Sequence, residues 1–157
     1  MKKLLWVVVV GFCVGGCTAR EPVTTKEETR NFVKEGVESL TKKDVEGALR
    51  SFEQAIVQDP RNEKAHFILA QTLMHIREYQ RAAKSFMAVV KINPDNGEAY
   101  LLLGGCFDLM GNKDEAIKNV QKSVEIFQRQ RDEERFKQSV VILHRLMGVN
   151  DSAGHRR

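Results

Sequence analysis

Side chains that could carry out chemistry are few in this sequence, and their spacing favours no catalytic mechanism. The chain has four widely separated histidines, which are His66, His75, His144 and His155. They do not form the i, i+4 pair that, together with a glutamate, is typical of a metalloprotease helix. Cys106 lies in an apolar stretch predicted to be helical, where a buried and inert thiol is expected. With no phosphate-binding glycine loop and no nucleophile elbow, the sequence predicts no enzyme, no metal site and no cofactor.

Cys17, in contrast, stands in a setting that suits covalent modification. An aliphatic residue and two small ones precede it, Val14, Gly15 and Gly16. These four residues resemble the lipobox of bacterial lipoproteins. In that family the small residues let the backbone enter a peptidase, and the resemblance implies that the thiol takes up a diacylglycerol group through a thioether bond. The resemblance implies that Cys17 becomes the acylated first residue, held on a bilayer by several acyl chains.

The residues before Cys17 have the layout of a lipoprotein signal peptide, predicted at 1–16. Two lysines are followed by about thirteen apolar or small residues, fewer than the ~20 that a membrane-spanning helix needs. An uncleaved apolar anchor and an ordinary cleaved signal remain as alternatives. Thr18 follows the cysteine where enteric lipoproteins of the inner membrane have Asp, so the resemblance favours the outer membrane, facing the periplasm. Residues 17–27 are predicted to be the lipidated cysteine and a flexible tether.

The clearest internal pattern is a repeat with a period of 34 residues. Asp59 and Pro60 recur at this interval as Asn93 and Pro94. Small and aromatic residues keep the same register: Gly36, Ala70 and Gly104; Ala48, Ala82 and Ala116; Phe52, Phe86 and Val120. These residues resemble the tetratricopeptide repeat, a helix-turn-helix unit. The resemblance implies an all-α fold, a right-handed superhelical array of three repeats at about 29–62, 63–96 and 97–128.

Local signals support helices at these positions without the resemblance. Asn62 and Asn96 are placed to cap the helices that follow each proline, and Thr25 with Glu28 forms a possible capping box for the first helix. Asp44 and Asn112 mark the turns inside hairpins. The third repeat has Gln128 where proline is expected, so its second helix is predicted to run on or to bend gently into the next segment.

A last amphipathic helix is predicted at 132–148, which completes a domain over 28–148. Its apolar stripe consists of Phe136, Val140, Leu143 and Met147, with Val141 and Leu146 beside them. A capping role is expected because a repeat array must cover its last apolar face, and a partner-binding helix is the alternative. Residues 149–157 are predicted to be a disordered tail.

The resemblance places a binding groove on the concave side, lined by the first helix of each repeat. The residues predicted to bind a partner there are Val33, Val37, Lys64, Phe67, Gln71, Met74, His75, Leu101 and Asp108. The same inward stripe also contains Arg30, Leu40, Thr41, Glu98, Gly105 and Leu109. Chaperone-binding family members hold a peptide carboxylate with a clamp of basic residues. This clamp is not reproduced here, because Lys64 is the only one of its basic residues that remains. An apolar or amphipathic segment is therefore the expected ligand, while any one of these residues could serve only as hairpin core.

The charge pattern supports no other class of partner. The formal charge is +4, and basic residues are interleaved with acidic ones, as on a solvated helix face rather than a nucleic-acid-binding stripe. We therefore predict a membrane-anchored scaffold of the bacterial cell envelope that binds proteins of envelope assembly. The alternative is a structural protein that self-associates into oligomers by stacking repeats.

Overall fold

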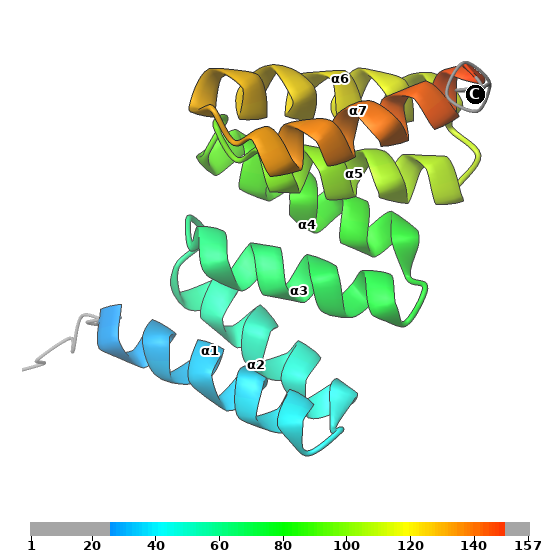
Figure 1. The fold of residues 1–157 in the computed structure, drawn as a ribbon. Helices are drawn as coiled ribbons and strands as arrows, with labels where there is room; N and C mark the ends of the chain where they lie inside the picture. The colour runs from blue at the N-terminus through cyan, green and yellow to red at the C-terminus, as the bar shows by residue number, and fades with distance from the viewer. Residues whose placement is uncertain (1–25, 150–157) are drawn as a thin grey trace, which may run out of the picture.

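The computed structural model describes residues 26–149, and over this range it contains seven helices and no strand (Figure 1). The helices are α1 (Lys26–Thr41), α2 (Val45–Gln58), α3 (Glu63–His75), α4 (Tyr79–Ile92), α5 (Gly97–Leu109), α6 (Lys113–Gln130) and α7 (Glu133–Met147). The predictions for the signal peptide, Cys17, most of the tether, Thr25 and all but the first residue of the tail lie outside the described residues. No helix within 26–149 is both long enough and apolar enough to cross a membrane.

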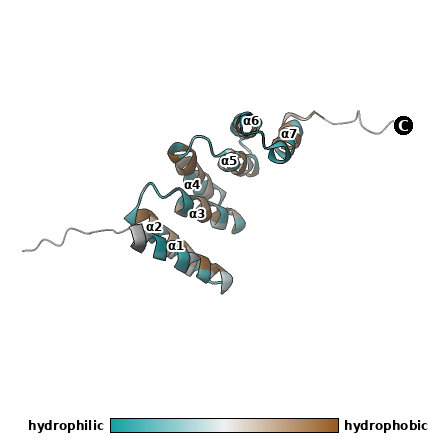
Figure 2. Ribbon diagram, turned by 60° about the vertical axis from the view of Figure 1, so that its left-hand side comes forward, coloured by the Kyte–Doolittle hydropathy of each residue, from teal (hydrophilic) through white to brown (hydrophobic). Residues whose placement is uncertain are grey.

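Six of the helices form three antiparallel hairpins that stack in chain order, and α7 follows the last hairpin (Figure 1). In Figure 2 the first helix of each hairpin and α7 line one side of the array, and the second helices line the other. The predicted all-α array of three helix-turn-helix units with a C-terminal capping helix is confirmed.

The small residues of the repeat lie where the two helices of a hairpin cross. A Cβ atom added to Gly104 of α5 would lie 2.6 Å from Val120 Cγ2 of α6, and one added to Gly36 of α1 would overlap the ring of Phe52. Ala70 of α3 is fully buried at the equivalent position. The spacing of small residues therefore sets how closely the helices approach each other.

The main core is continuous through the three hairpins rather than divided among them. Phe52 and Phe86, which share a repeat position, are fully buried and belong to one cluster with Leu73 and Leu103. Each buried aromatic or leucine side chain contributes on the order of 1.5–3 kcal/mol to folding. Neighbouring hairpins thus stabilise one another through shared apolar contacts.

The turns inside the hairpins share a backbone feature that the sequence did not reveal. Lys43, Arg77 and Gly111, each 34 residues apart, have φ values of 62°, 65° and 79°. This left-handed conformation suits glycine, yet only the third turn has one. In the third turn, the amide of Gly111 donates to the carbonyl of Asp108 at 2.9 Å, which satisfies a carbonyl at the end of α5.

The connections between hairpins begin in extended backbone and end in a side-chain cap. Asn62 Oδ1 accepts a hydrogen bond from the amide of Ala65 at 2.9 Å, and Asn96 Oδ1 accepts one from Ala99 at 2.9 Å. Both caps were predicted. The proline-free α6–α7 connection differs, because α6 has 18 residues where α2 and α4 have 14, and it ends at Arg131 in a left-handed conformation. The expected lengthening of this helix is confirmed.

Helix α7 covers the last hairpin with a face that includes Leu143 and Leu146 of the predicted apolar residues but is turned from the predicted stripe. Leu146 is buried, and Ile142 and Leu143 pack beside it against Ala116 and Val120 of α6. Of the predicted stripe Phe136, Val140, Leu143 and Met147, only Leu143 belongs to this cluster. The contact also includes a buried hydrogen bond between Ser123 and Ser139, 3.1 Å between the hydroxyl oxygens. A search for apolar spacing ignores a polar residue such as Ser139 at the centre of the interface. The prediction therefore gave α7 a buried face that is turned from the observed one.

Candidate functional site: the concave groove

The groove begins at α1, where the two predicted valines have different surroundings. Val33 is 6% exposed and packs in a small cluster with Ala55 and Ala65. Val37, one turn further along α1, is 41% exposed. Val33 therefore contributes mainly to the core, and Val37 presents apolar surface to the outside.

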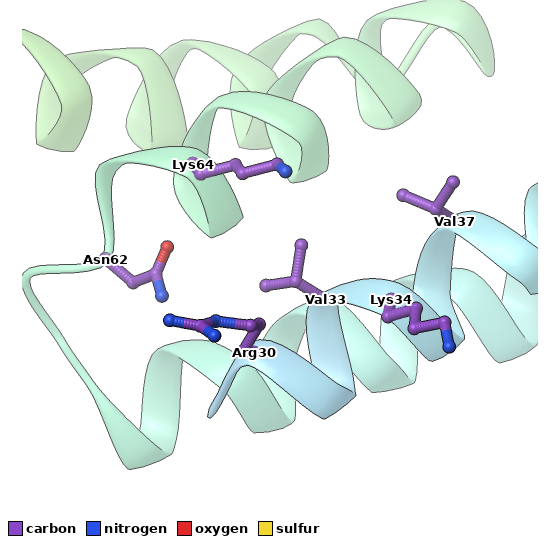
Figure 3. Close-up of a pocket in the computed structure, with 6 residues that line it drawn as sticks. All are labelled: Arg30, Val33, Lys34, Val37, Asn62 and Lys64. Atoms are coloured by element: carbon purple, nitrogen blue, oxygen red, sulfur yellow. The ribbon is translucent and has the colours of Figure 1, made fainter. Parts of the chain in front are cut away.

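Between α1 and the start of α3 lies a hollow of about 540 Å³ (Figure 3). Its lining residues are Arg30, Val33, Lys34, Val37, Asn62 and Lys64, which include three cations and no carboxylate. In Figure 3 the Val33 side chain of α1 points into the space below Lys64 of α3, and Arg30 extends toward Asn62. The hollow thus combines an apolar floor with a positively charged rim.

The ion pair between Lys34 and Glu38 leaves the positive charge of the rim largely uncompensated. Lys34 Nζ lies 3.9 Å from Glu38 Oε1, but both side chains are mostly exposed, and such pairs contribute little. The side-chain oxygen of Asn62 already accepts the hydrogen bond that caps α3. A carboxylate entering the hollow would therefore meet cations from both α1 and α3.

In the second hairpin, the predicted groove residues are divided between core and surface. Phe67 packs edge to face on Phe86, with ring centroids 5.7 Å apart, and Met74 also contacts the main core. Both are half-buried, so each offers part of its surface to a ligand. Gln71 and His75 are exposed.

In the third hairpin, α7 occupies part of the predicted groove. Leu101 packs against the cluster of α6 and α7 residues. Asp108 Oδ2 lies 3.8 Å from Arg145 of α7, and Glu98 Oε2 lies 3.5 Å from Arg135. A Cβ atom added to Gly105 would have no neighbour within 4 Å, so the surface stays open at that residue.

Sequence reasoning missed two residues of the hollow, Lys34 and Asn62. Lys34 directly follows Val33 on α1, and Asn62 was assigned only as a helix cap. Their position depends on how far α3 lies from α1, a distance that no local pattern encodes. The nine predicted binding residues remain a prediction, since no ligand contact is present to test them.

Cys106 and metal ligands are the remaining candidates for chemistry within residues 26–149. Burial raises the pKa of the Cys106 thiol from its usual value near 9.0 to about 11, so the thiol is protonated at neutral pH. It is a free, fully buried cysteine. Between residues 26 and 149 no three His, Cys, Asp or Glu side chains gather as metal ligands. The groove is therefore the candidate functional site.

The comparison with protein families identifies the class. The model of the tetratricopeptide repeat family matches residues 42–124, more than half of the chain. The hairpins, the small residues at their crossings and the groove are those expected of this class. The chain belongs to the tetratricopeptide repeat family.

The individual relatives are more distant. The DnaJ homolog subfamily C member 7 homolog of Dictyostelium discoideum is 25% identical over 134 residues, which cover 77% of this chain and 25% of that protein. The crystal structure of MamA is 24% identical with a TM-score of 0.67 and covers 85% of this chain and 77% of that chain. The Yersinia enterocolitica type III secretion chaperone SycD, in complex with a peptide of the translocator YopD, is 13% identical with a TM-score of 0.72. That match covers 78% of this chain and 95% of SycD. These likenesses show a shared fold.

Proposed function

We propose that this protein is a lipid-anchored adaptor of the bacterial cell envelope, which holds a segment of a partner protein in its concave groove and has no catalytic role. The hollow between α1 and α3 supports the proposal most directly, because it is a preformed recess with apolar and cationic lining. SycD, which has the same fold, was solved with a peptide bound. The partner is expected to be a protein of envelope assembly.

The lining of the hollow supports a proposal for the chemistry of the ligand. Val33 and Val37 favour an aliphatic side chain, and the cations of Arg30, Lys34 and Lys64 favour a nearby carboxylate. The exposed part of Phe67 extends the apolar surface toward the second hairpin. The expected ligand is therefore an amphipathic helix or extended peptide that carries acidic residues.

Site-specific photo-crosslinking in the native envelope tests the groove. A photoreactive residue in place of Val37, at the rim of the hollow, is expected to capture a partner that mass spectrometry identifies. The matched control is Val57 on α2, which is 74% exposed and does not line the hollow. Capture at residue 57 but not at residue 37 would reject the groove as the binding surface.

A charge reversal tests the ligand chemistry. Lys64→Glu changes an exposed side chain, so the helicity and unfolding midpoint should stay unchanged while capture at residue 37 falls. The control reversal is Lys84→Glu on α4, which is also exposed and does not line the hollow. Equal capture by the Lys64 and Lys84 variants would rule out recognition of an acidic segment at the hollow.

The anchor is proposed from the sequence around Cys17. Val14, Gly15 and Gly16 precede this cysteine as in a lipobox, and the tether of 17–27 would let the domain stand off the bilayer. Cys17→Ala is expected to move the protein from the membrane fraction to the soluble fraction, with Cys13→Ala as the control. Continued membrane retention of the Cys17 variant would indicate an uncleaved apolar segment instead.

A further inference from the structure

The chain enters α1 beside the hollow between α1 and α3. Helix α1 begins at Lys26, and its next turns contribute Arg30 and Val33 to the lining. Asn62 and Lys64, at the start of α3, lie across from them. In Figure 1, α1 and α3 begin on the same side of the array, and Figure 3 shows Arg30, Asn62 and Lys64 around one end of the hollow. The chain that precedes Lys26 is therefore attached directly beside the candidate binding site.

The segment before α1 has the chemistry that the hollow is expected to bind. Residues 18–25, which lie outside the described residues, read Thr-Ala-Arg-Glu-Pro-Val-Thr-Thr and contain one carboxylate, Glu21, and one valine, Val23. Pro22 disfavours helical backbone at the residue before it, so an extended conformation is expected at Glu21. Side chains two residues apart on an extended chain point to the same side. Glu21 and Val23 would thus face the hollow together, and Arg20 would face away from it.

The length of this segment is sufficient to bring Glu21 to the cations. Glu21 precedes Lys26 by five residues, which span up to about 16 Å when extended. At 1.5 Å of rise per residue, Arg30 lies about 6 Å and Lys34 about 12 Å along α1 from Lys26. A chain that turns back at the start of α1 therefore reaches both cations. Thr25, the predicted cap of α1, is placed where the backbone leaves the helical conformation.

The next junction of the array shows how an asparagine at this repeat position binds a carboxylate. There the side-chain amide of Asn96 donates to Glu63 Oε1 at 2.8 Å. Asn62 is the equivalent of Asn96 one repeat earlier, but Thr29 stands at the position of Glu63 and has no carboxylate. The neighbouring Asp59 is not among the residues that line the hollow. The first junction thus has the amide donor and lacks the acidic partner that the second junction supplies from its own helices.

We propose that residues 21–23 of the same chain dock into this hollow, with Val23 on its apolar floor and Glu21 among its cations. A contact of two side chains is weak, but the covalent link to α1 gives the segment an effective concentration in the millimolar range. The segment then competes with the partner, a consequence that rests on the proposed binding of a partner at the hollow. The apparent affinity for a partner falls in proportion to the fraction of hollows that the segment occupies.

Docking of the segment would also set how far the domain stands from the proposed anchor. With Glu21 held in the hollow, the chain from Cys17 to Glu21 spans at most about 13 Å. With the segment released, the chain from Cys17 to Lys26 spans up to about 30 Å. A partner that displaces the segment would therefore lengthen the tether, so that binding and reach are coupled.

Photo-crosslinking of the full-length chain in its own membranes tests the docking. A photoreactive residue in place of Val37 is expected to form a crosslink within the same chain, which mass spectrometry locates in residues 18–25 and which keeps the mass of a monomer. The same residue in place of Val57 on α2, which does not line the hollow, is the control and should give no such crosslink. No crosslink from residue 37 to residues 18–25, an equal yield from residue 57, or a product with the mass of a dimer would overturn the proposal.

A matched pair of neutralising substitutions then tests the role of the carboxylate. Glu21→Gln is expected to lower the crosslink within the chain about threefold and to raise partner capture at residue 37, because the segment competes less well for the hollow. Arg20→Gln, at the side chain that faces away, should change neither yield. Both substitutions lie outside the lipobox of 14–17, and membrane fractionation confirms that each variant keeps its location. Equal effects of the two variants would overturn the assignment of Glu21 to the hollow.

The same measurements separate this proposal from the adaptor function. A crosslink to residues 18–25 without partner capture in any variant would support the docking and contradict the proposed adaptor. Partner capture at residue 37 without a crosslink to residues 18–25 would overturn the docking and support the adaptor.

Discussion

The first and third hairpins use the same repeat positions for opposite purposes. Arg30 of α1 lines an open hollow, whereas Glu98, which occupies the equivalent position in α5, forms an ion pair with Arg135 of α7. The concave surface is thus cationic and open at one end, and anionic and covered at the other. The difference shows that the next helix decides whether a groove position is available to a ligand, while the repeat position alone does not.

Glycine substitutions at the helix crossings should give the largest difference in stability between the first and third hairpins. Gly104→Ala in the third hairpin is expected to lower the free energy of unfolding by about 2 kcal/mol, because the new Cβ would meet both Val120 and the carbonyl oxygen of Ala116. Gly36→Ala in the first hairpin should cost about 1 kcal/mol, since the three atoms nearest the new Cβ belong to the Phe52 side chain and none of them to the backbone. Urea denaturation measures both.

Gly105→Ala is the matched control for this pair of variants. Its new methyl group would meet no atom within 4 Å, and alanine is a better helix former than glycine. The free energy of unfolding should therefore rise by about 0.5–1 kcal/mol. Losses of equal size at residues 104 and 105 would contradict the assignment of one glycine to the crossing and the other to the open surface.

The third hairpin should also have a pH dependence that the first lacks. Because the pKa of Cys106 is raised to about 11, folding favours the protonated thiol. Its contribution is fully present below pH 9 and is lost as the pH rises through 11, since the unfolded chain ionises first. Between pH 8 and pH 10 the protein should lose about 1.4 kcal/mol more than a Cys106→Ala variant. Parallel stability curves for the two proteins would refute this assignment.

The hairpin turns allow a second comparison of the first and third hairpins, with expected changes of similar size in the free energy of unfolding. Lys43→Gly in the first hairpin should raise the free energy of unfolding by about 1 kcal/mol, because glycine adopts a positive φ without strain. Gly111→Ala in the third should lower it by a similar amount. Thermal unfolding tests both, with Lys42→Gly as the control, which is expected to give no gain because Lys42 does not have a positive φ.

The smallest effect is expected where α7 covers the groove. Arg145→Ala should cost only about 0.2–1 kcal/mol, because the ion pair with Asp108 is largely exposed. A double-mutant cycle with Asp108→Ala isolates that coupling. Arg30→Ala should leave stability unchanged, since Arg30 lines an open hollow. A large loss for the Arg30 variant would show that this end of the groove also has a structural role.

The repeat architecture was predictable because its determinants are local. Gly104 and Val120 lie on the facing sides of two helices joined by a short turn, and Asn62 and Asn96 each cap the helix that they directly precede. The positive φ of Lys43 was not predictable, because lysine gives no sign of it and the hairpin geometry imposes it. Neither was the hollow, since the position of Lys34 relative to α3 follows from the angle between hairpins.

The buried face of α7 is a further feature that the sequence alone did not predict. Spacing alone correctly located the helix and its apolar residues, but the buried Ser139 lies in the contact with α6, and Met147 of the predicted stripe is 51% exposed. Apolar periodicity reports how much apolar surface a helix has. It does not report which side a neighbouring helix will cover when a polar pair can be satisfied in the interface.

At Gly105 the shape of the groove can change without a change in the packing of the core. Its position in the predicted groove is surrounded by open space, so a larger side chain there would change the shape offered to a ligand without displacing any core residue. The neighbouring Gly104 permits no such freedom. Within one helical turn, the chain therefore contains both a residue that evolution can vary to acquire a new partner and a residue that it must keep.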